Sequence, residues 1–443
     1  MKWFKRILVA LVLLLAVALP FFISLNDYIP QIEKAASDRL KEPVSIESIR
    51  FAALPLPHVM LNGITVGATS DVKLGKVRVI PDLFSLFQPT RVIKSIEIDT
   101  LILTQHAINK IPVWAHADKS PQQSVRVESV RLNNAQVNFG KASFGPFDAR
   151  VSLNSKGEPQ DASITAQDGQ LKVLIKFDGS KYQLDASAKS WTLPTGPTLV
   201  FDELLIKGVA TLSELNLSAV SARLYGGMAN GKATLSWQKG WRLNGNLDIN
   251  QVEVQKIASM LSSRTRVSGK LSAKPVFSAS AASADQLVKV LRLKTTFSVQ
   301  NGVLQGVDIR EAATQLSGQG TTGGETRFDA LSGYLVMERG GYHFTQLKIA
   351  SGALAVDGNV SISPKKALSG RINAQVKMMG ARTSVPLNVA GTVEAPLLYP
   401  TAGTMTGAAL GTVLLGPGIG TSVGVKAGVW AEGLFGKREK PKK

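Results

Sequence analysis

Cysteine is absent from this sequence of 443 residues, and histidine is scarce. Without cysteine the chain can form no disulfide framework, no thiolate nucleophile and no thiolate metal site. None of its four histidines stands three to five residues from another, which is the usual spacing of helix-borne metal ligands. We therefore expect neither a metal site nor a bound cofactor. The histidines are His58, His106, His116 and His343.

Acidic residues are outnumbered, because 32 Asp and Glu stand against 51 Lys and Arg, which gives a formal net charge of +19 at pH 7. Such an excess favours contact with an anionic partner, such as nucleic acid or a lipid surface. The alternative is a basic surface that serves solubility alone, because the charges are scattered along the chain.

Charge is missing altogether from residues 7–25, a run close to the length that crosses the hydrocarbon core of a bilayer. Lys2, Lys5 and Arg6 precede the run and should stay in the cytoplasm, which places the rest of the chain across the membrane. The alternative is a cleaved signal peptide, with Ala16 and Ala18 as its small-residue pair. We favour an uncleaved anchor because the run is longer than a signal core requires. We expect no nucleic-acid partner.

Long helical patterns are rare, and the main one spans residues 27–41. Ile29, Ile32, Ala36 and Leu40 share one of its faces, and Pro43 ends the pattern. Such an amphipathic helix caps the end of a sheet or lies on a bilayer, and capping is the more common arrangement. Shorter helical patterns occur at 254–261, 284–293 and 308–316, the last followed by Gly318 as a C-cap.

From about residue 44 to 400 the sequence is dominated by short alternating runs of apolar and polar residues, separated by Gly, Asn, Asp and Pro. Alternation of period two is typical of a strand with one apolar and one polar face. Residues 233–238 and 241–249 are the clearest pair, and we predict a hairpin there. The expected fold is mainly β, with a long antiparallel sheet and a few short amphipathic helices.

Three glycine motifs match enzyme signatures but lack the required context. A P-loop needs Ser or Thr and a helix after its lysine, whereas Ala233 and a strand pattern follow Lys232. A dinucleotide motif follows a strand and opens a helix, and the order here is reversed. A nucleophile elbow is followed along the chain by a histidine, and no histidine occurs after His343. We therefore expect no enzymatic activity. The last two motifs are Gly318, Gly320 and Gly323, and Gly420, Ser422 and Gly424.

The sequence changes character at residue 402, where glycine begins to recur at every fourth position. This spacing gives a helix a smooth face that another helix can approach closely, as in membrane pairs. Because Pro417 divides the run into halves too short to span a bilayer, a re-entrant or interfacial hairpin is one expectation. A flexible Gly-rich tail is the other. The final residues, GKREKPKK, are basic and suited to anionic headgroups.

We expect six segments, and the bounds within 26–401 follow the family resemblance that is described next. They are a cytoplasmic basic segment (1–6), a transmembrane anchor (7–25), an amino-terminal module (26–103), a β-rich middle region (104–220), a carboxyl-terminal β region (221–401), and the glycine-spaced segment with its basic tail (402–443).

Several of these segments resemble the AsmA family of membrane-anchored bacterial envelope proteins, which are relatives of the bridge-like lipid-transfer group. The anchor, the amphipathic helix and the segment LPLPHVMLNGITV are similar to the amino-terminal module of that family. RLYGGMANGKATLSW followed by GWRLNGNLDI is similar to its recurring hairpin, and the order from TTFSVQNGVLQGVDI to VPLNVAGTVEAPLLYP is similar to its carboxyl-terminal region. The shared motifs are turns and strands rather than catalytic residues, and the tail after Thr401 departs from the pattern.

The resemblance implies a long twisted sheet curled into an apolar groove, anchored in the bacterial inner membrane, reaching into the periplasm and associated with lipid supply to the outer envelope. The leading hypothesis is a protein that shields the acyl chains of phospholipid or another envelope lipid. Burial of each methylene group is worth about 0.8 kcal/mol, so the protein can retain a long acyl chain without any specific polar contact. The candidate lining residues are Leu235, Trp237, Trp241, Leu243, Leu247, Ile249, Phe297, Val299, Leu347, Ile349, Leu354 and Val356.

The rival hypothesis is an envelope scaffold or assembly factor that binds an outer-membrane or periplasmic protein. In that case the apolar face of the sheet is filled by the protein's own side chains. Alternation alone does not separate the two hypotheses, because an ordinary sandwich core requires the same pattern.

Overall fold

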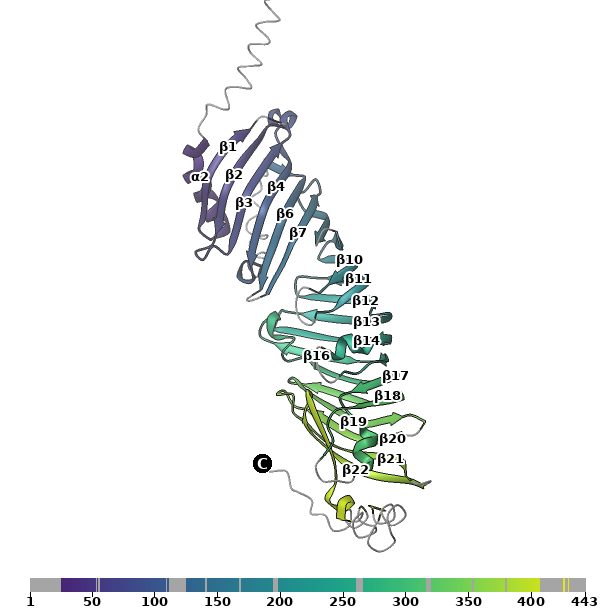
Figure 1. Ribbon diagram of the computed structural model, residues 1–443. Helices are drawn as coiled ribbons and strands as arrows, with labels where there is room; N and C mark the ends of the chain where they lie inside the picture. Colours follow the sequence, from purple (N-terminus) through teal and green to yellow (C-terminus); the bar gives the residue numbers. More distant parts are fainter. Residues whose placement is uncertain are drawn as a thin grey trace, which may run out of the picture. The chain divides into compact units, whose positions relative to one another are not determined.

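The structure is a computed structural model, and it describes residues 25–52, 54, 56–108, 110, 125–139, 142–166, 169–193, 198–259, 266–315, 320–352, 354–378, 381–406, 425–426 and 429. Over these residues the protein is mainly β, with 23 strands in one sheet and few, short helices (Figure 1). Its contacts divide into two compact units, and the boundary passes through β11 (Val200–Ala210) and β12 (Glu214–Leu224). The expectation of a mainly β chain is confirmed.

Unit 1 begins with the 3-10 helix η1 (Leu25–Tyr28) and the helix α2 (Ile29–Leu40), which confirms the helix expected at 27–41. A second 3-10 helix, η2 (Leu83–Phe87), lies between the third and fourth strands. The strands of this unit are β1 (Val44–Ala52), β2 (His58–Val66), β3 (Val72–Pro81), β4 (Arg91–Thr104), β5 (Val125–Val127), β6 (Ser129–Phe139), β7 (Ala142–Leu153), β8 (Pro159–Ala166), β9 (Leu171–Asp178) and β10 (Lys181–Thr192).

The helix α2 and the preceding turn cover the outer edge of β1. Side chains of this segment accept hydrogen bonds from three β1 amides: Ser37 Oγ from Val44 N at 2.9 Å, Glu33 Oε1 from Ile46 N at 2.6 Å, and Asn26 Oδ1 from Ile49 N at 2.9 Å. An uncovered edge strand offers its amides to other chains. This is the capping arrangement, one of the two expected for the helix.

The expectation of an antiparallel sheet is wrong at one place in unit 1. β4 pairs in parallel with β5 and β6, for example Ile96 with Val130, whereas β1 to β4 and β6 to β10 are otherwise joined by antiparallel pairs. Parallel neighbours need a crossover connection of a dozen or more residues, and residues 105–124 separate β4 from β5. Alternation reports the faces of a strand but not its direction, which is why the sequence did not predict this pair.

The apolar side chains of unit 1 line up across its strands. Each residue in one such line pairs with the next, so all of them lie on the same face of the sheet. The line runs through Phe51, Val59, Val79, Ile96, Val130, Val151, Ala162, Ile175 and Leu184.

Between residues 216 and 400, the described part of unit 2 is a second run of antiparallel strands with two short helices and one 3-10 helix. Its elements are β13 (Gly227–Ser236), β14 (Trp241–Glu253), α4 (Val254–Ala258), β15 (Lys270–Ala273), β16 (Val276–Ala281), η3 (Ala284–Gln286), β17 (Arg292–Gln305), α5 (Ile309–Thr314), β18 (Glu325–Glu338), β19 (Gly341–Ala350), β20 (Leu354–Ile362), β21 (Leu368–Met378), β22 (Ala381–Thr392) and β23 (Ala395–Pro400).

Two of the three short helices expected in this unit are confirmed. α4 lies within 254–261, and α5 lies within 308–316, with the Asp308 side chain accepting a hydrogen bond from Glu311 N at 2.8 Å as an N-cap. The helix expected at 284–293 is wrong beyond η3, because Leu293 belongs to β17 and pairs with Met337. Gly318, the expected C-cap, lies outside the described residues.

The predictions for the two ends of the chain fall largely outside the described residues. These include the basic segment 1–6, all of the anchor except Leu25, and the tail 402–443 apart from residues 402–406, 425–426 and 429. Residues 402–406 are helical. Within the part of the chain that is described, no helix combines the length and the apolar character that crossing a membrane requires.

Candidate functional site

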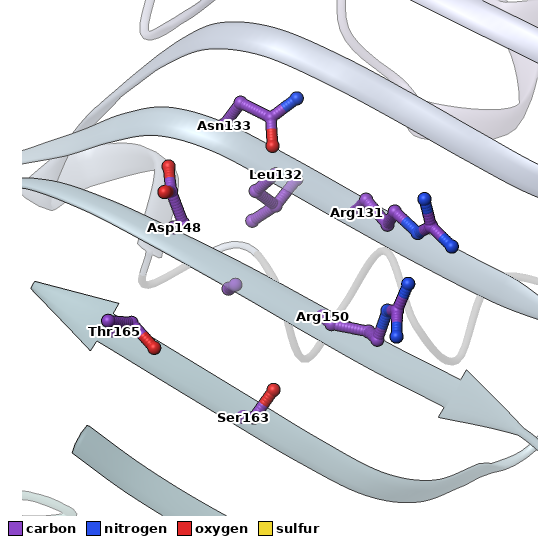
Figure 2. Close-up of a pocket in the computed structure, with 8 residues that line it drawn as sticks. Arg131, Leu132, Asn133, Asp148, Arg150, Ser163 and Thr165 are labelled. Atoms are coloured by element: carbon purple, nitrogen blue, oxygen red, sulfur yellow. The ribbon is translucent and has the colours of Figure 1, made fainter. Parts of the chain in front are cut away.

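One shallow pocket lies on the polar face of unit 1, across β6, β7 and β8 (Figure 2). Its volume of about 180 Å³ is below the range typical of small-molecule sites. Several of its polar groups already have partners: Asn133 Nδ2 donates to Asp99 Oδ1 at 2.7 Å, and Asp148 Oδ1 accepts from Asn134 N at 2.9 Å. The pocket is lined by Arg131, Leu132, Asn133, Asp148, Ala149, Arg150, Ser163 and Thr165.

An ionic network borders this pocket. Hydrogen bonds from Asn133 and then from Arg78 lower the pKa of the Asp99 carboxyl, and the same bond from Arg78 raises the pKa of its guanidinium. Arg78 also lies 3.3 Å from Glu97, which Arg131 approaches from β6 at 3.3 Å. These shifts stabilise the charged forms on both sides, which is typical of a structural cross-strand network rather than of an acid and base pair.

Metal ligands do not cluster in the described part of the chain, where no group of three His, Asp or Glu side chains could hold an ion. His58 is buried and its Nδ1 lies 2.7 Å from Leu56 O, while His343 Nδ1 lies 3.0 Å from Ser361 Oγ. His106 lies 3.8 Å from the Asp71 carboxylate. His116 is outside the described residues.

The P-loop-like stretch is part of a hairpin. Lys232 lies inside β13 opposite Asn246 of β14, so a strand rather than a helix follows it, as the sequence predicted. Gly320 and Gly323 precede β18 in a loop, both with positive φ. Gly318 and the elbow-like Gly420, Ser422 and Gly424 lie outside the described residues.

The same hairpin carries the first group of candidate lining residues. Leu235 lies directly opposite Leu243, and the rings of Trp237 and Trp241 are 5.8 Å apart at 31°. Directly paired side chains lie on one face of a sheet, and residues two apart on a strand return to it. All six are half-buried: Leu235, Trp237, Trp241, Leu243, Leu247 and Ile249.

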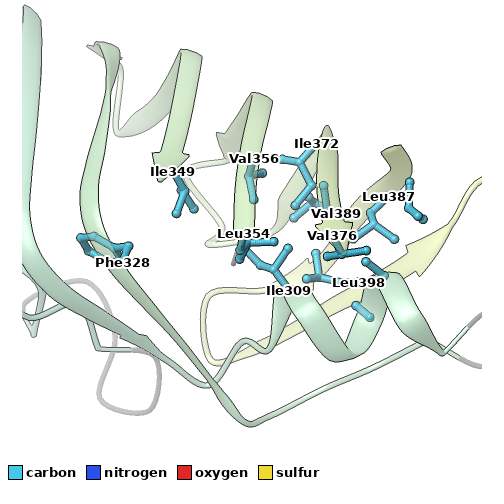
Figure 3. Close-up of a cluster of buried hydrophobic side chains, with 14 of the residues drawn as sticks. Ile309, Phe328, Ile349, Leu354, Val356, Ile372, Val376, Leu387, Val389 and Leu398 are labelled. Carbon is cyan, nitrogen blue, oxygen red and sulfur yellow. The ribbon is translucent and has the colours of Figure 1, made fainter. Parts of the chain in front are cut away.

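The second group lies farther along the same face and divides into two environments, of which Figure 3 shows the buried one, with Ile349, Leu354 and Val356. Val299, Ile349, Leu354 and Val356 are at most 9% exposed and belong to a buried cluster, against which Phe297 packs. Leu347 is half-buried and outside that cluster. The helix α5 closes the cluster with Ile309, Ala312 and Ala313, of which the two alanines are wholly buried.

Cross-strand pairing defines what we call the covered row, whose members all belong to this cluster or pack against it. Each residue pairs with the next from β15 to β22. The covered row is Leu271, Val299, Leu331, Ile349, Val356, Ala374 and Val385.

A second row on the same face, which we call the half-exposed row, lies outside the cluster. Each of its members pairs with the next from β14 to β20, and all are half-buried. α5 contacts β18, β21, β22 and β23 among the described elements. The half-exposed row is Gly245, Phe277, Leu293, Met337, Tyr342 and Ile362.

Sequence reasoning missed this row for two physical reasons. Leu293 was assigned to a helix, and the bulge at Gln346, whose φ is 52°, shifts the alternation of β19 by one residue. Phe344 and Leu347 therefore lie on the same face although they are three residues apart. The pairing of Tyr342 with Met337 becomes visible only once that bulge is known.

The opposite face of these strands is polar. Arg242 and Asn244 of β14 alternate with the apolar positions and are exposed. Arg292 pairs with Glu338 at 3.1 Å, and Lys274 lies 3.9 Å from Asp248. The sheet of unit 2 is thus amphipathic, and its apolar face is closed by α5 over the covered row and half-exposed along the second row.

In comparisons of the chain with protein-family models, with curated proteins and with solved structures, none of the three found a match.

Proposed function

We propose that this protein shields the acyl chains of phospholipid, or of another envelope lipid, on the apolar face of unit 2, and that it thereby supports phospholipid transport or outer-membrane biogenesis. The observation that carries the proposal is the half-exposed row. Covering apolar surface is worth about 25 cal/mol per Å², and large contiguous apolar patches on monomers mark binding sites. An acyl chain covers such a row without needing a polar partner.

The resemblance to the AsmA family supports the rest of this assignment. It favours a single-pass anchor in the bacterial inner membrane, a periplasmic location for the β units, a sheet that curls into a groove, and a role without catalysis. The twist of neighbouring strands, about 20–25° per pair, is the physical means by which such a sheet would curl around a lipid tail.

The test is photo-crosslinking in cells that express the full chain. A photo-reactive amino acid is placed at Leu243, Phe277 or Tyr342 on the apolar face, and lipids are radiolabelled. The matched controls carry it one residue away, at Arg242, Ser278 and His343, which point to the opposite face of the same strands. We expect labelled lipid on the protein at the first three positions only.

A polar substitution gives the second arm of the test. Leu243→Asp together with Tyr342→Asp places one charge on the half-exposed row and one on the same face of β14, two residues from Gly245 of that row, and we expect it to abolish lipid crosslinking at Phe277. Asn244→Asp with His343→Asp on the opposite face is the control. Undiminished lipid in the apolar-face variant, or equal lipid labelling from both faces, would sink the proposal.

The covered row supports a second candidate function, that of a scaffold or assembly factor. Along that row the face is filled by the protein's own side chains, as that hypothesis requires. If the scaffold hypothesis is also right for the half-exposed row, probes at Leu243, Phe277 and Tyr342 capture one outer-membrane or periplasmic protein and no lipid.

A further inference from the structure

The most exposed large apolar side chains of the described residues gather at one end of unit 1. Phe87, Phe84 and Leu54 are 93%, 84% and 81% exposed, and no other large apolar side chain described reaches these values. Leu56 and Leu83 beside them are 59% and 45% exposed. We call these five residues the apolar collar.

The register of the sheet brings the two parts of the collar to the same end. The turn that carries Leu54 and Leu56 joins β1 to β2, where Ala52 pairs with His58. The next residue of β2, Val59, pairs with Val79 near the last residues of β3. The segment that follows β3 contains η2 and therefore leaves the sheet beside that turn.

Hydrogen bonds hold both segments in place while their apolar side chains face outward. Ser85 of η2 is buried, and its Oγ accepts from Val92 N at 2.7 Å and donates to Asp82 O at 2.7 Å. Asp82 Oδ1 accepts from Phe84 N at 3.0 Å. His58 Nδ1 lies 2.7 Å from Leu56 O in the other segment. The collar is thus displayed by a built support.

The amino end of the described chain lies at this same end of the unit. Its side chains contact β1 in reverse order, with Ser37 at Val44, Glu33 at Ile46 and Asn26 at Ile49. Toward residue 25 the chain therefore approaches the end at which β1 meets the collar. The residues that precede it in sequence, 7–24, carry no charge.

Basic side chains lie on the strand ends next to the collar. Arg50 near the end of β1, Arg91 at the start of β4 and Lys94 are all exposed. Lys94 lies 3.8 Å from the Asp82 carboxylate, the acidic group at the base of η2. Apolar tips backed by Arg and Lys suit the boundary between acyl chains and anionic headgroups.

From these observations we infer that the apolar collar inserts into the interfacial layer of a lipid bilayer, beside the point where the apolar segment 7–25 enters it. The collar then fixes how unit 1 stands on the membrane, which a single anchor does not. The inference uses the expected anchor and does not require that the protein carries lipid.

The absence of cysteine permits a direct test in the full chain. Single variants Phe84→Cys, Phe87→Cys and Leu54→Cys are labelled with a polarity-sensitive fluorophore and reconstituted into vesicles of phosphatidylethanolamine and phosphatidylglycerol. The control is Leu174→Cys, on β9 of the same unit and 58% exposed. We expect blue-shifted emission at the three collar positions, with loss of emission when the vesicles contain brominated acyl chains, and neither change at the control.

A further variant separates insertion from other causes of a shift. In the chain with Phe84→Glu and Phe87→Glu, the label at Leu54→Cys should lose its response to brominated lipid while the protein stays in washed vesicles. Water-like emission at all three collar positions would overturn the inference. A blue shift that is unaffected by brominated lipid and increases with protein concentration would also overturn the inference, because it indicates contact between copies of the chain.

Discussion

Gly302 shows how closely single residues are fitted in unit 2. A Cβ at this position would collide with the ring of Phe328, which is 4% exposed, and with the backbone oxygen of Ser268. The aromatic ring occupies the space that a side chain would need. No such neighbour stands near Gly352, where a Cβ would meet nothing within 4 Å.

We expect Gly302→Ala to lower the free energy of unfolding by about 1–3 kcal/mol, because overpacking forces the ring or the strand to move. Denaturant unfolding followed by circular dichroism measures the change. Gly352→Ala is the matched control and should stay within about 0.5 kcal/mol of the wild type. Equal effects of the two substitutions would show that the Phe328 contact has no energetic weight.

The Asp99 carboxylate should make the stability of the fold depend on pH. Its pKa is lowered, first by the hydrogen bond from Asn133 and then by Arg78. A lowered pKa in the folded state stabilises the fold at neutral pH, above the carboxyl's ordinary value, and this stabilisation is lost as the pH falls through the lowered value. Asp99→Asn should therefore be less stable than the wild type at pH 7, by no more than about 1 kcal/mol because the pair is partly exposed.

The measurement is the unfolding midpoint of both proteins from pH 7 downward. The gap between them should narrow as the pH falls below about 4, the ordinary range of an aspartate. A gap that stays constant with pH would mean that the charge of Asp99 does not contribute. Asp178→Asn, at the exposed last residue of β9, is the control for a simple change of net charge.

Among the elements, α2 covers the edge of β1 through polar side chains, which its amphipathic pattern alone does not identify. Its amphipathic pattern predicted a helix, and the structure shows that polar side chains of α2 and η1 bind the β1 edge. We expect the triple variant Asn26→Ala, Glu33→Ala and Ser37→Ala to speed hydrogen exchange at the amides of Val44, Ile46 and Ile49. Hydrogen exchange with mass spectrometry measures this.

The matched control substitutes polar residues of α2 that accept none of these bonds, such as Gln31→Ala with Lys34→Ala. Exchange at β1 should then match the wild type. If the triple variant also exchanges like the wild type, packing of the helix rather than its side-chain acceptors protects the edge.

Elements differ in how well the sequence predicts them, and the differences have physical causes. The β13–β14 hairpin was predicted because nothing interrupts its alternation between Ala233 and Ile249. Alternation fails at bulges, where residues such as Gln251 and Gln346 adopt positive φ. Beyond a bulge, the side chains that point to the apolar face change from odd to even positions, or the reverse. Leu287 and Leu291 at helical spacing suggested a longer helix in a segment that forms the short 3-10 helix η3 and then hydrogen-bonded turns.

The candidate lining residues show the same limit. All of them lie on one face of unit 2, which alternation can indicate because the period of a strand is a local property. Alternation could not tell that Val299, Ile349, Leu354 and Val356 would be buried in a cluster that includes residues of α5, because that depends on contacts between segments distant in sequence. Nor could it identify the half-exposed row, whose members meet only through the register.

At the scale of the whole molecule, contacts are mostly between strands that follow one another in the chain. Each unit has its own buried residues, and Leu387 of β22 is wholly buried in unit 2. Leu387→Ala should cost about 2–5 kcal/mol, as other large-to-small core changes do. We expect faster hydrogen exchange in β17 to β23 and unchanged exchange in β1 to β9.

The reciprocal variant is Ile49→Ala in unit 1, where Ile49 is 4% exposed. It should speed exchange in β1 to β4 and leave β17 to β23 unchanged. Faster exchange across both units from either substitution would show that the protein opens as one cooperative body, against the division seen in its contacts.

Most strands whose registers are described pair with the strand that precedes them, and this order bears on how the chain folds as it is delivered. A strand that emerges last finds the edge it needs already formed, so little chain must be closed into a loop before each contact is made. A short exception is β16, which pairs with β14 across the four residues of β15. The longer exception is β4 with β5 and β6, where residues 105–124 intervene and the new strand runs parallel to β4. Because synthesis delivers the chain from its amino end, we expect the main delay in folding during synthesis to come before Val125 emerges.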